Sequence, residues 1–173
     1  DKGVPLLVEA IQGADAELSR DAIGLAPLVG GSEATKAFAA LLPQLAAESQ
    51  ELMVRSLGNR NGPTAAPAIA AAAKSDHANV RLAAVEALGS VGDASAVRPL
   101  AQAAAEGTEK SAARASLLRL QGGDIDTALI QAAGSGAPEV RAECIRALAG
   151  RKVTKAVELL YGAARDDNAT VRQ

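Results

Sequence analysis

The sequence predicts an all-α protein, a right-handed α-α superhelix of five to six helical-hairpin repeats. The first observation behind this prediction is an apolar position that recurs at steps of 31, 31, 31, 30 and 30 residues, because a fixed period of this size is typical of stacked repeats. This column consists of Leu7, Phe38, Ile69, Leu100, Ile130 and Leu160. The second observation is a composition with 49% hydrophobic but only 1% aromatic residues, since alanine-rich segments favour helices.

Further columns keep the same period and divide each repeat into two helices. In the second helix of each repeat they are Val4, Thr35, Ala66, Val97, Thr127 and Val157, and Ala10, Leu41, Ala72, Ala103, Ala133 and Ala163. In the first helix they are Ile23, Val54, Val85, Ala115 and Ile145, and Ala26, Leu57, Leu88, Leu118 and Leu148. Isolated helices of about 12 residues are marginal in water, so we expect neighbouring repeats to cover these apolar faces.

The clearest repeat, residues 80–107, shows how each helix should begin and end. Gly89 and Gly92 fall where the first helix must stop, because glycine accepts the left-handed conformation. Asp93 then follows as a candidate cap for the next helix. Pro99 lies several residues into that helix, so we expect a local distortion there.

The remaining elements follow from the same columns and breaks. We expect first helices at 16–29, 48–58, 79–90, 109–120 and 139–149, and second helices at 2–12, 33–45, 64–75, 94–106, 124–134 and 153–165. Gly24 and Pro27 interrupt the first of these patterns. The chain then forms a single domain, 1–173, with repeat units at about 1–13, 14–47, 48–76, 77–107, 108–136, 137–166 and 167–173. Since both ends fall inside repeats, we expect a piece of a longer protein.

Composition limits the function classes. The formal net charge of −2 and pI of about 5.5 argue against a protein that follows a phosphate backbone, which usually carries a basic face. The single cysteine excludes an internal disulfide and leaves the compartment open. No stretch approaches the roughly 18 uninterrupted apolar residues of a membrane span. We therefore expect a soluble protein, cytoplasmic or exported.

Several motifs resemble the HEAT-like repeats first noted in phycobiliprotein bilin lyases. They are Val80-Arg81, Ala87-Leu88-Gly89, Gly92-Asp93 and Pro99-Leu100, with partial copies at Val140-Arg141 and Val171-Arg172. The resemblance covers essentially the whole chain and implies the fold, here as a fragment of a larger bacterial protein. It also implies a protein-binding scaffold whose second helices line the concave side. The run at 113–120 is similar to HEAT stretches in exported multidomain bacterial proteins, which implies an accessory segment beside a sugar-acting or haem-carrying domain.

No catalytic or metal site is expected. His77 is the only histidine and is followed by Ala78, whereas the metal sites of the HEAT-repeat deoxyhypusine hydroxylases use His-Glu pairs. One histidine and one cysteine cannot form a Cys/His zinc site. Cys144 falls at a core-like position, which favours a buried, inert thiol over a nucleophile. We therefore predict no cofactor, no metal and no enzymatic activity for this chain.

Other polar motifs have structural explanations. Asp124, Asp126, Asp166 and Asp167 lie at helix starts or turns, where capping explains them better than metal binding. Gly122-Gly123 and Gly134-Ser-Gly136 fit repeat turns better than phosphate loops, because no strand precedes them. Asn168-Ala-Thr170 has the spacing of a glycosylation site but also suits a helix start.

Three arginines recur after a valine at the start of first helices: Arg81, Arg141 and Arg172. They could form a basic ladder for anionic ligands. The alternative, which we favour, is pairing with turn acids such as Asp76 and Asp167, five residues earlier.

Removing the core columns leaves a candidate partner-binding set on the second helices. Its members are Lys36, Arg98, Gln102, Gln131, Glu158 and Tyr161. Tyr161 is the one aromatic residue able to anchor a partner there, and the alanine-rich middle of this face predicts a shallow, apolar groove. An ordinary solvated face is the alternative.

The leading functional prediction is a non-catalytic scaffold that binds a partner protein or a neighbouring domain. An accessory module of an exported sugar-acting or redox enzyme is the first rival. Nucleic-acid binding, as in the HEAT-like DNA glycosylases, is the second, and the mixed charges of Lys36, Arg98 and Glu158 argue against it. A bilin lyase is a fourth alternative, for which no individual residue gives specific support.

Overall fold

The computed structural model describes residues 3–60, 62–122 and 124–172. Within these residues it contains eleven α-helices and no strand, so the predicted all-α repeat fold is confirmed. The first helices of the repeats are α2 (Ala16–Leu25), α4 (Ala47–Gly58), α6 (Ala78–Val91), α8 (Lys110–Arg119) and α10 (Pro138–Gly150). The second helices are α1 (Gly3–Gln12), α3 (Ser32–Leu41), α5 (Ala66–Ala72), α7 (Val97–Glu106), α9 (Ile125–Ala133) and α11 (Val157–Ala163). Predictions that involve Asp1, Lys2, Gly123 or Gln173 fall outside the described residues.

Each predicted helix is present, but proline shortens two of them. Pro27 and Pro43 have no N–H group to continue an α-helix, and the chain there forms the 3₁₀ turns η1 (Ala26–Leu28) and η2 (Leu42–Gln44). The predicted helices 16–29 and 33–45 therefore end as α2 and α3 followed by one tighter turn.

Three second helices instead begin with a 3₁₀ turn: η3 (Pro63–Ala65), η4 (Ala94–Ala96) and η5 (Thr154–Ala156). The distortion expected at Pro99 takes this form, because α7 starts only at Val97 and Pro99 lies in its first turn, where no N–H group is needed. Asp93 caps η4 as predicted, since its carboxylate accepts hydrogen bonds from the Ser95 backbone N–H at 2.9 Å and the Ser95 hydroxyl at 2.6 Å.

The helix predicted at 79–90 is α6, but the left-handed glycine expected at its end is not found: neither Gly89 nor Gly92 has a positive φ. Helix α6 continues to Val91, and Gly89 is buried inside it. Val91 is itself buried, so the last turn of α6 contributes to the core and the helix ends only at Gly92.

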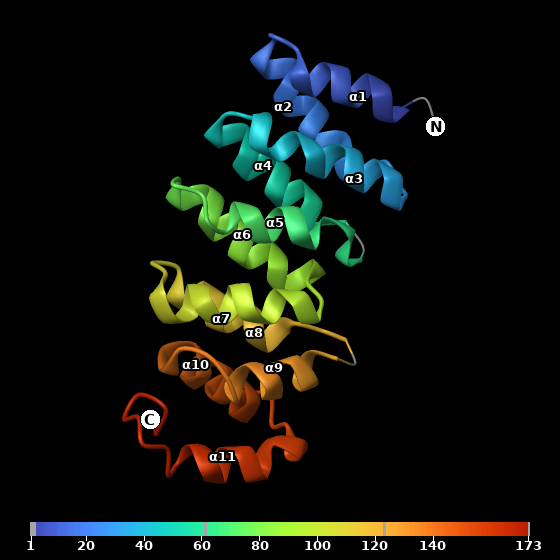
Figure 1. Cartoon of the computed structure of the whole chain (residues 1–173). Coiled ribbons are helices and arrows are strands. Elements are labelled where there is room, and N and C mark those ends of the chain that lie inside the picture. The colour runs from blue at the N-terminus through green and yellow to red at the C-terminus, as the bar shows by residue number, and fades with distance from the viewer. Residues whose placement is uncertain (1–2, 61, 123, 173) are drawn as a thin grey trace. The chain divides into compact units, whose positions relative to one another are not determined.

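The chain forms two compact units, Asp1–Val91 and Gly92–Gln173. In the first unit α4 packs on α2 and α6, and α5 packs on α6; in the second α10 packs on α7 and α9, and α7 packs on α8 (Figure 1). The fully buried large side chains of the first unit are Ile23, Phe38, Met53, Leu57, Ile69 and Leu88. Those of the second unit are Leu100, Leu117, Leu120, Ile125, Leu129 and Leu148. One apolar stripe of each helix thus meets the neighbouring hairpin.

The predicted columns are wrong by one residue in the repeat formed by α8 and α9. Leu118 is 48% exposed and Ala115 is exposed, whereas Leu117 is fully buried. In α9 the fully buried residue is Leu129, and Ile130 is only partly buried. The buried residues Leu100 of α7 and Leu117 of α8 are 17 positions apart, whereas Leu129 of α9 and Leu148 of α10 are 19 apart. The buried positions of this repeat therefore fall one residue earlier than even 30-residue steps predict.

Neighbouring alanine substitutions in α9 test this register. Leu129→Ala removes a fully buried side chain and should lower the free energy of unfolding by about 2–5 kcal/mol. Ile130→Ala should cost clearly less, because Ile130 is already in partial contact with water. Urea denaturation followed by circular dichroism measures both. A larger loss for Ile130→Ala than for Leu129→Ala would restore the register with even 30-residue steps.

Candidate partner-binding surface

The exposed sides of the second helices carry the residues predicted to bind a partner. In the first unit Lys36 lies on α3, and its ammonium group pairs with Glu33 one turn earlier at 2.7 Å. Both side chains are mostly exposed, so this pair contributes little to stability. Lys36 therefore remains available on the surface of α3.

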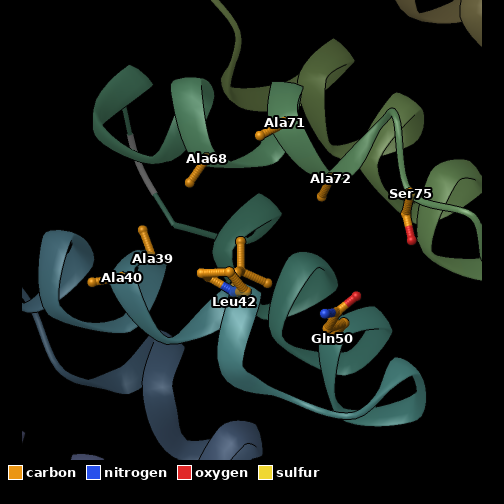
Figure 2. A pocket seen from close by; sticks show the side chains of 9 residues that line it. Ala39, Ala40, Leu42, Gln50, Ala68, Ala71, Ala72 and Ser75 are labelled. Atoms are coloured by element: carbon orange, nitrogen blue, oxygen red, sulfur yellow. The ribbon is translucent and has the colours of Figure 1, made fainter.

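An apolar hollow, here called the alanine groove, lies between two second helices of the first unit. Its volume is about 420 Å³, and it runs between α3 with η2 on one side and α5 on the other (Figure 2). It is lined by Ala39, Ala40, Leu42, Pro43, Gln50, Ala68, Ala71, Ala72 and Ser75. Alanine side chains are small, so they leave open a space that larger side chains would fill. The predicted apolar, alanine-rich groove is thus present in the first unit.

The other five predicted residues lie in the second unit, and all are exposed. Arg98 and Gln102 are on α7, Gln131 is on α9, and Glu158 and Tyr161 are on α11. Only two of them are linked: Arg98 Nη2 donates to the hydroxyl of Ser135 at 3.3 Å, and that hydroxyl donates to the Gln131 carbonyl at 3.2 Å. This chain ties Arg98 of α7 to the turn that follows α9.

Tyr161 lies in an apolar part of this surface. Its side chain is 65% exposed, and it lines a hollow of about 410 Å³ with Val157 and Leu160 of α11 and with Ala164, which follows that helix. The ring can therefore meet a partner's apolar side chain without any rearrangement of the core.

Cys144 lies in the core of the second unit, as predicted. It is fully buried on α10, and burial raises the pKa of its thiol to about 11. The thiolate is the reactive form, so this environment keeps the sulfur unreactive. His77 is exposed in the turn before α6.

Beside Cys144, a buried carboxylate forms an ion cluster that the sequence did not reveal. Glu143 accepts two hydrogen bonds from Arg114, at 2.8 and 2.7 Å, and one from Arg146 at 2.5 Å. Burial acts to raise the pKa of Glu143, but the hydrogen bonds from Arg114 and Arg146 outweigh it and lower that pKa below its usual value. The cluster joins α8 to α10 on the side of the first helices.

Side-chain capping accounts for only some of the four aspartates that were predicted to cap helix starts or turns. Asp124 precedes α9 but makes no side-chain capping bond, and Asp126 instead accepts from Arg151 Nε at 2.9 Å. The capping prediction is therefore wrong for these two. Asp166 accepts from the Asn168 backbone N–H at 2.9 Å, which together with Arg141 lowers the pKa of Asp166.

Asn168 caps the turn that follows Asp166. Its side-chain oxygen accepts from the Thr170 backbone N–H at 2.8 Å, but the described residues that follow form a turn and not the helix that Asn168-Ala-Thr170 was expected to start.

The three recurring arginines hold the turns between repeats, but mostly through the main chain. Arg81 donates to the carbonyls of Ser75 and Asp76 at 2.8 and 3.0 Å. Arg172 makes the same bonds to the carbonyls of Asp166 and Asp167 at 2.7 and 2.9 Å. The structural role is confirmed: Arg81 and Arg172 bind the turns through main-chain carbonyls, among them those of the two predicted acids, Asp76 and Asp167.

Arg141 is the member of this set that does reach a carboxylate. It donates to the Ala133 carbonyl at 3.1 Å and to Asp166 at 2.5 Å. Its acid partner lies at the next turn along the chain, 25 residues later, since position 136, five residues before Arg141, is a glycine.

Two further arginines, Arg60 and Arg151, bind the turns that connect the two helices of a repeat. Each follows a first helix and reaches back to the hairpin before it: Arg60 donates to the Ala26 and Gly31 carbonyls, and Arg151 to the Leu117 and Leu120 carbonyls. Sequence reasoning missed them, although both stand three residues after a core leucine, Leu57 or Leu148.

The described residues contain no group of three His, Cys, Asp or Glu side chains arranged to hold a metal ion. None of the helices formed by these residues combines the length and the apolarity that crossing a bilayer requires.

The burial of Cys144 predicts slow thiol modification. A thiol-specific reagent at pH 8 should react with the native chain only as fast as the chain unfolds, because Cys144 is fully buried. Raising the pH to 9 should then add little, since unfolding and not ionisation of the thiol limits the rate. In urea the reaction should be immediate. The control is Ser111→Cys with Cys144→Ala, which presents an exposed thiol and should react rapidly. Fast, pH-dependent reaction of native Cys144 would contradict its burial.

Comparisons with known proteins now place the fold in a family. The model of HEAT repeats matches residues 36–120 and 126–173. No curated protein matches the sequence. Among solved structures, the complex of CpcE and CpcF of phycocyanin lyase from Nostoc sp. PCC7120 contains a similar chain, with a TM-score of 0.61 and 19% identity over 98% of this chain and 73% of that one.

Two engineered proteins are also similar. Each is 20% identical, with TM-scores of 0.50 and 0.52, and the match covers 98% of this chain and 94% and 92% of theirs. At such identities the likeness concerns the fold alone. The family model, in contrast, spans most of the sequence and matches the repeats described above, so the chain belongs to the HEAT-repeat family.

Proposed function

We propose that this protein is a non-catalytic binding scaffold whose second helices take a partner protein or a neighbouring domain. The observation that carries the proposal is the alanine groove between α3 with η2 and α5. It is an open apolar hollow whose floor consists mainly of methyl groups, on helices whose other faces already form the core.

The chemistry of the groove favours an apolar partner segment. Apart from Gln50 and Ser75, the lining side chains are alanine, leucine and proline, which offer no nucleophile or titrating group. Binding there would be driven by removing apolar surface from water, at about 25 cal/mol per Å². Ala40 and Ala71 are exposed, so a partner can reach them without unfolding any element.

The exposed residues of the second unit suit a protein partner as well. Arg98, Gln102, Gln131 and Glu158 offer mixed charge and hydrogen-bonding groups, and Tyr161 offers an aromatic anchor of the type enriched at binding hot spots. A surface that follows nucleic acid would be uniformly basic. The similar solved chain from Nostoc comes from a complex of two proteins, which supports association as a use of this fold.

Charged substitutions in the groove should abolish partner binding and leave the fold intact. In Ala40→Glu/Ala71→Glu two carboxylates enter the apolar hollow, where their desolvation opposes an apolar partner. Affinity capture from the source cell compares this variant with the native chain and with Ala16→Glu, which adds a carboxylate at an exposed position outside the groove. One protein retained by the native chain and by Ala16→Glu, but not by the groove variant, is the expected result.

A second variant tests the other surface. Arg98→Ala/Glu158→Ala/Tyr161→Ala should leave the helical circular dichroism spectrum unchanged and weaken capture of the same protein. If all variants retain that protein equally, the second-helix faces do not bind it. If stability collapses in the triple variant, these side chains belong to the core instead.

A further inference from the structure

Arg60 and Arg151 occupy equivalent positions in two repeats, yet their surroundings differ in one charge. In each case Nε donates to the residue 25 positions earlier, on the preceding second helix. For Arg151 that residue is Asp126, whose carboxylate accepts at 2.9 Å. For Arg60 it is Thr35, whose hydroxyl accepts at 2.7 Å. The guanidinium of Arg60 therefore has a neutral partner where that of Arg151 has an anion.

The charge of Arg60 is buried without a counter-ion. The residue is 8% exposed, and its three acceptors are the Thr35 hydroxyl and the Ala26 and Gly31 carbonyls. The ring of Phe38 lies 5.5 Å from the guanidinium carbon, and burial lowers the pKa of Arg60. No carboxylate of the described residues forms an ion pair with it. A buried charge of this kind is costly unless an opposite charge joins it.

A polar cavity lies against this guanidinium. Its volume is about 230 Å³, and it is lined by Pro27, Gly30, Gly31, Ser32, Thr35, Asn59, Arg60 and Thr64. Ser32 and Asn59 are exposed, so the cavity is reachable from solvent. Its volume is several times the roughly 30 Å³ that one water molecule takes up in the liquid, which leaves room for a carboxylate or a phosphate group.

The start of α3 adds to the positive character of this cavity. Gly31 precedes α3 with a φ of 94°, which a residue with a side chain rarely adopts, and no side chain caps the helix. The first backbone N–H groups of α3 therefore have no capping side chain as acceptor. The first of them belongs to Ser32, which lines the cavity. Helix N-termini favour anions, and here that preference coincides with the buried cation of Arg60.

We propose that the Arg60 cavity binds an oxyanion, and specifically a carboxylate, in the role that Asp126 fulfils for Arg151. The carboxylate would accept from Arg60 and from the N–H groups at the start of α3, with the hydroxyls of Ser32 and Thr64 beside it. A free small acid and an acidic side chain of a partner present the same group. The site is separate from the alanine groove and does not depend on the scaffold function.

The first test supplies the carboxylate within the chain. Thr35→Asp copies the arrangement of Asp126 and Arg151, and Thr35→Asn is the neutral control of equal size. If the cavity lacks an anion, Thr35→Asp should melt about 2–4 °C higher than Thr35→Asn, and the difference should vanish at a pH low enough to protonate the new aspartate. Equal melting temperatures at pH 7 would mean that the carbonyls already compensate Arg60, and would overturn the proposal.

The second test adds the anion from outside. The native chain is titrated with acetate, inorganic phosphate or an acidic peptide at constant ionic strength, and the Arg60 Nε–H signal is followed by NMR. A saturable shift that is absent in Thr35→Asp is the expected result. A saturable shift with acetate identifies a site for small acids, whereas one with the peptide alone identifies an acidic side chain. Identical responses in the native chain and Thr35→Asp, or no saturable response to any of the three, would refute the site.

Discussion

The structure depends on the burial of one apolar stripe per helix against the adjacent hairpin. The α-helices contain 7 to 14 residues, lengths at which an isolated helix is marginal in water. Phe38 and Leu100 are each fully buried, and each contributes only because a helix of another repeat covers it. The hairpins therefore stabilise one another, because an isolated hairpin could not bury its apolar stripes.

The turns contain main-chain carbonyl groups that need hydrogen-bond donors, and arginine side chains supply them. Carbonyl groups at helix ends lack partners within the helix, and small turns offer few side chains to satisfy them. Arg81 and Arg172 bind such carbonyls between repeats, and Arg60 and Arg151 bind them within repeats. A guanidinium has five N–H groups in a rigid fork, so one side chain can bind two or three carbonyls at once. Four of the 18 lysine and arginine residues are thus engaged in fixing turns.

The sequence predicted the helices because period and turn residues are local signals. It could not resolve the register of α8 and α9, since Leu117 and Leu118, like Leu129 and Ile130, are adjacent apolar residues that fit a column equally well. Burial in the stacked repeats decides between them. It also missed the targets of the arginines, because main-chain carbonyls carry no sequence signature.

The candidate surface was predictable in kind rather than in detail. The spacing correctly identified exposed positions such as Lys36 and Tyr161 and an alanine-rich groove on the second helices. The link from Arg98 through Ser135 and the uncompensated charge of Arg60 arise from contacts between residues 25 to 37 positions apart. Such contacts depend on how hairpins stack, which residue types alone do not specify.

Tyr161 has a consequence for how this molecule interacts with light. It is the only tyrosine, and the chain has no tryptophan and one phenylalanine, so nearly all absorption near 280 nm and nearly all intrinsic emission above 300 nm originate from one ring on α11. That ring is already 65% exposed in the folded state. Unfolding of the leucine-rich interior is therefore almost invisible to ultraviolet fluorescence, while any molecule that settles on α11 acts directly on the chain's single chromophore.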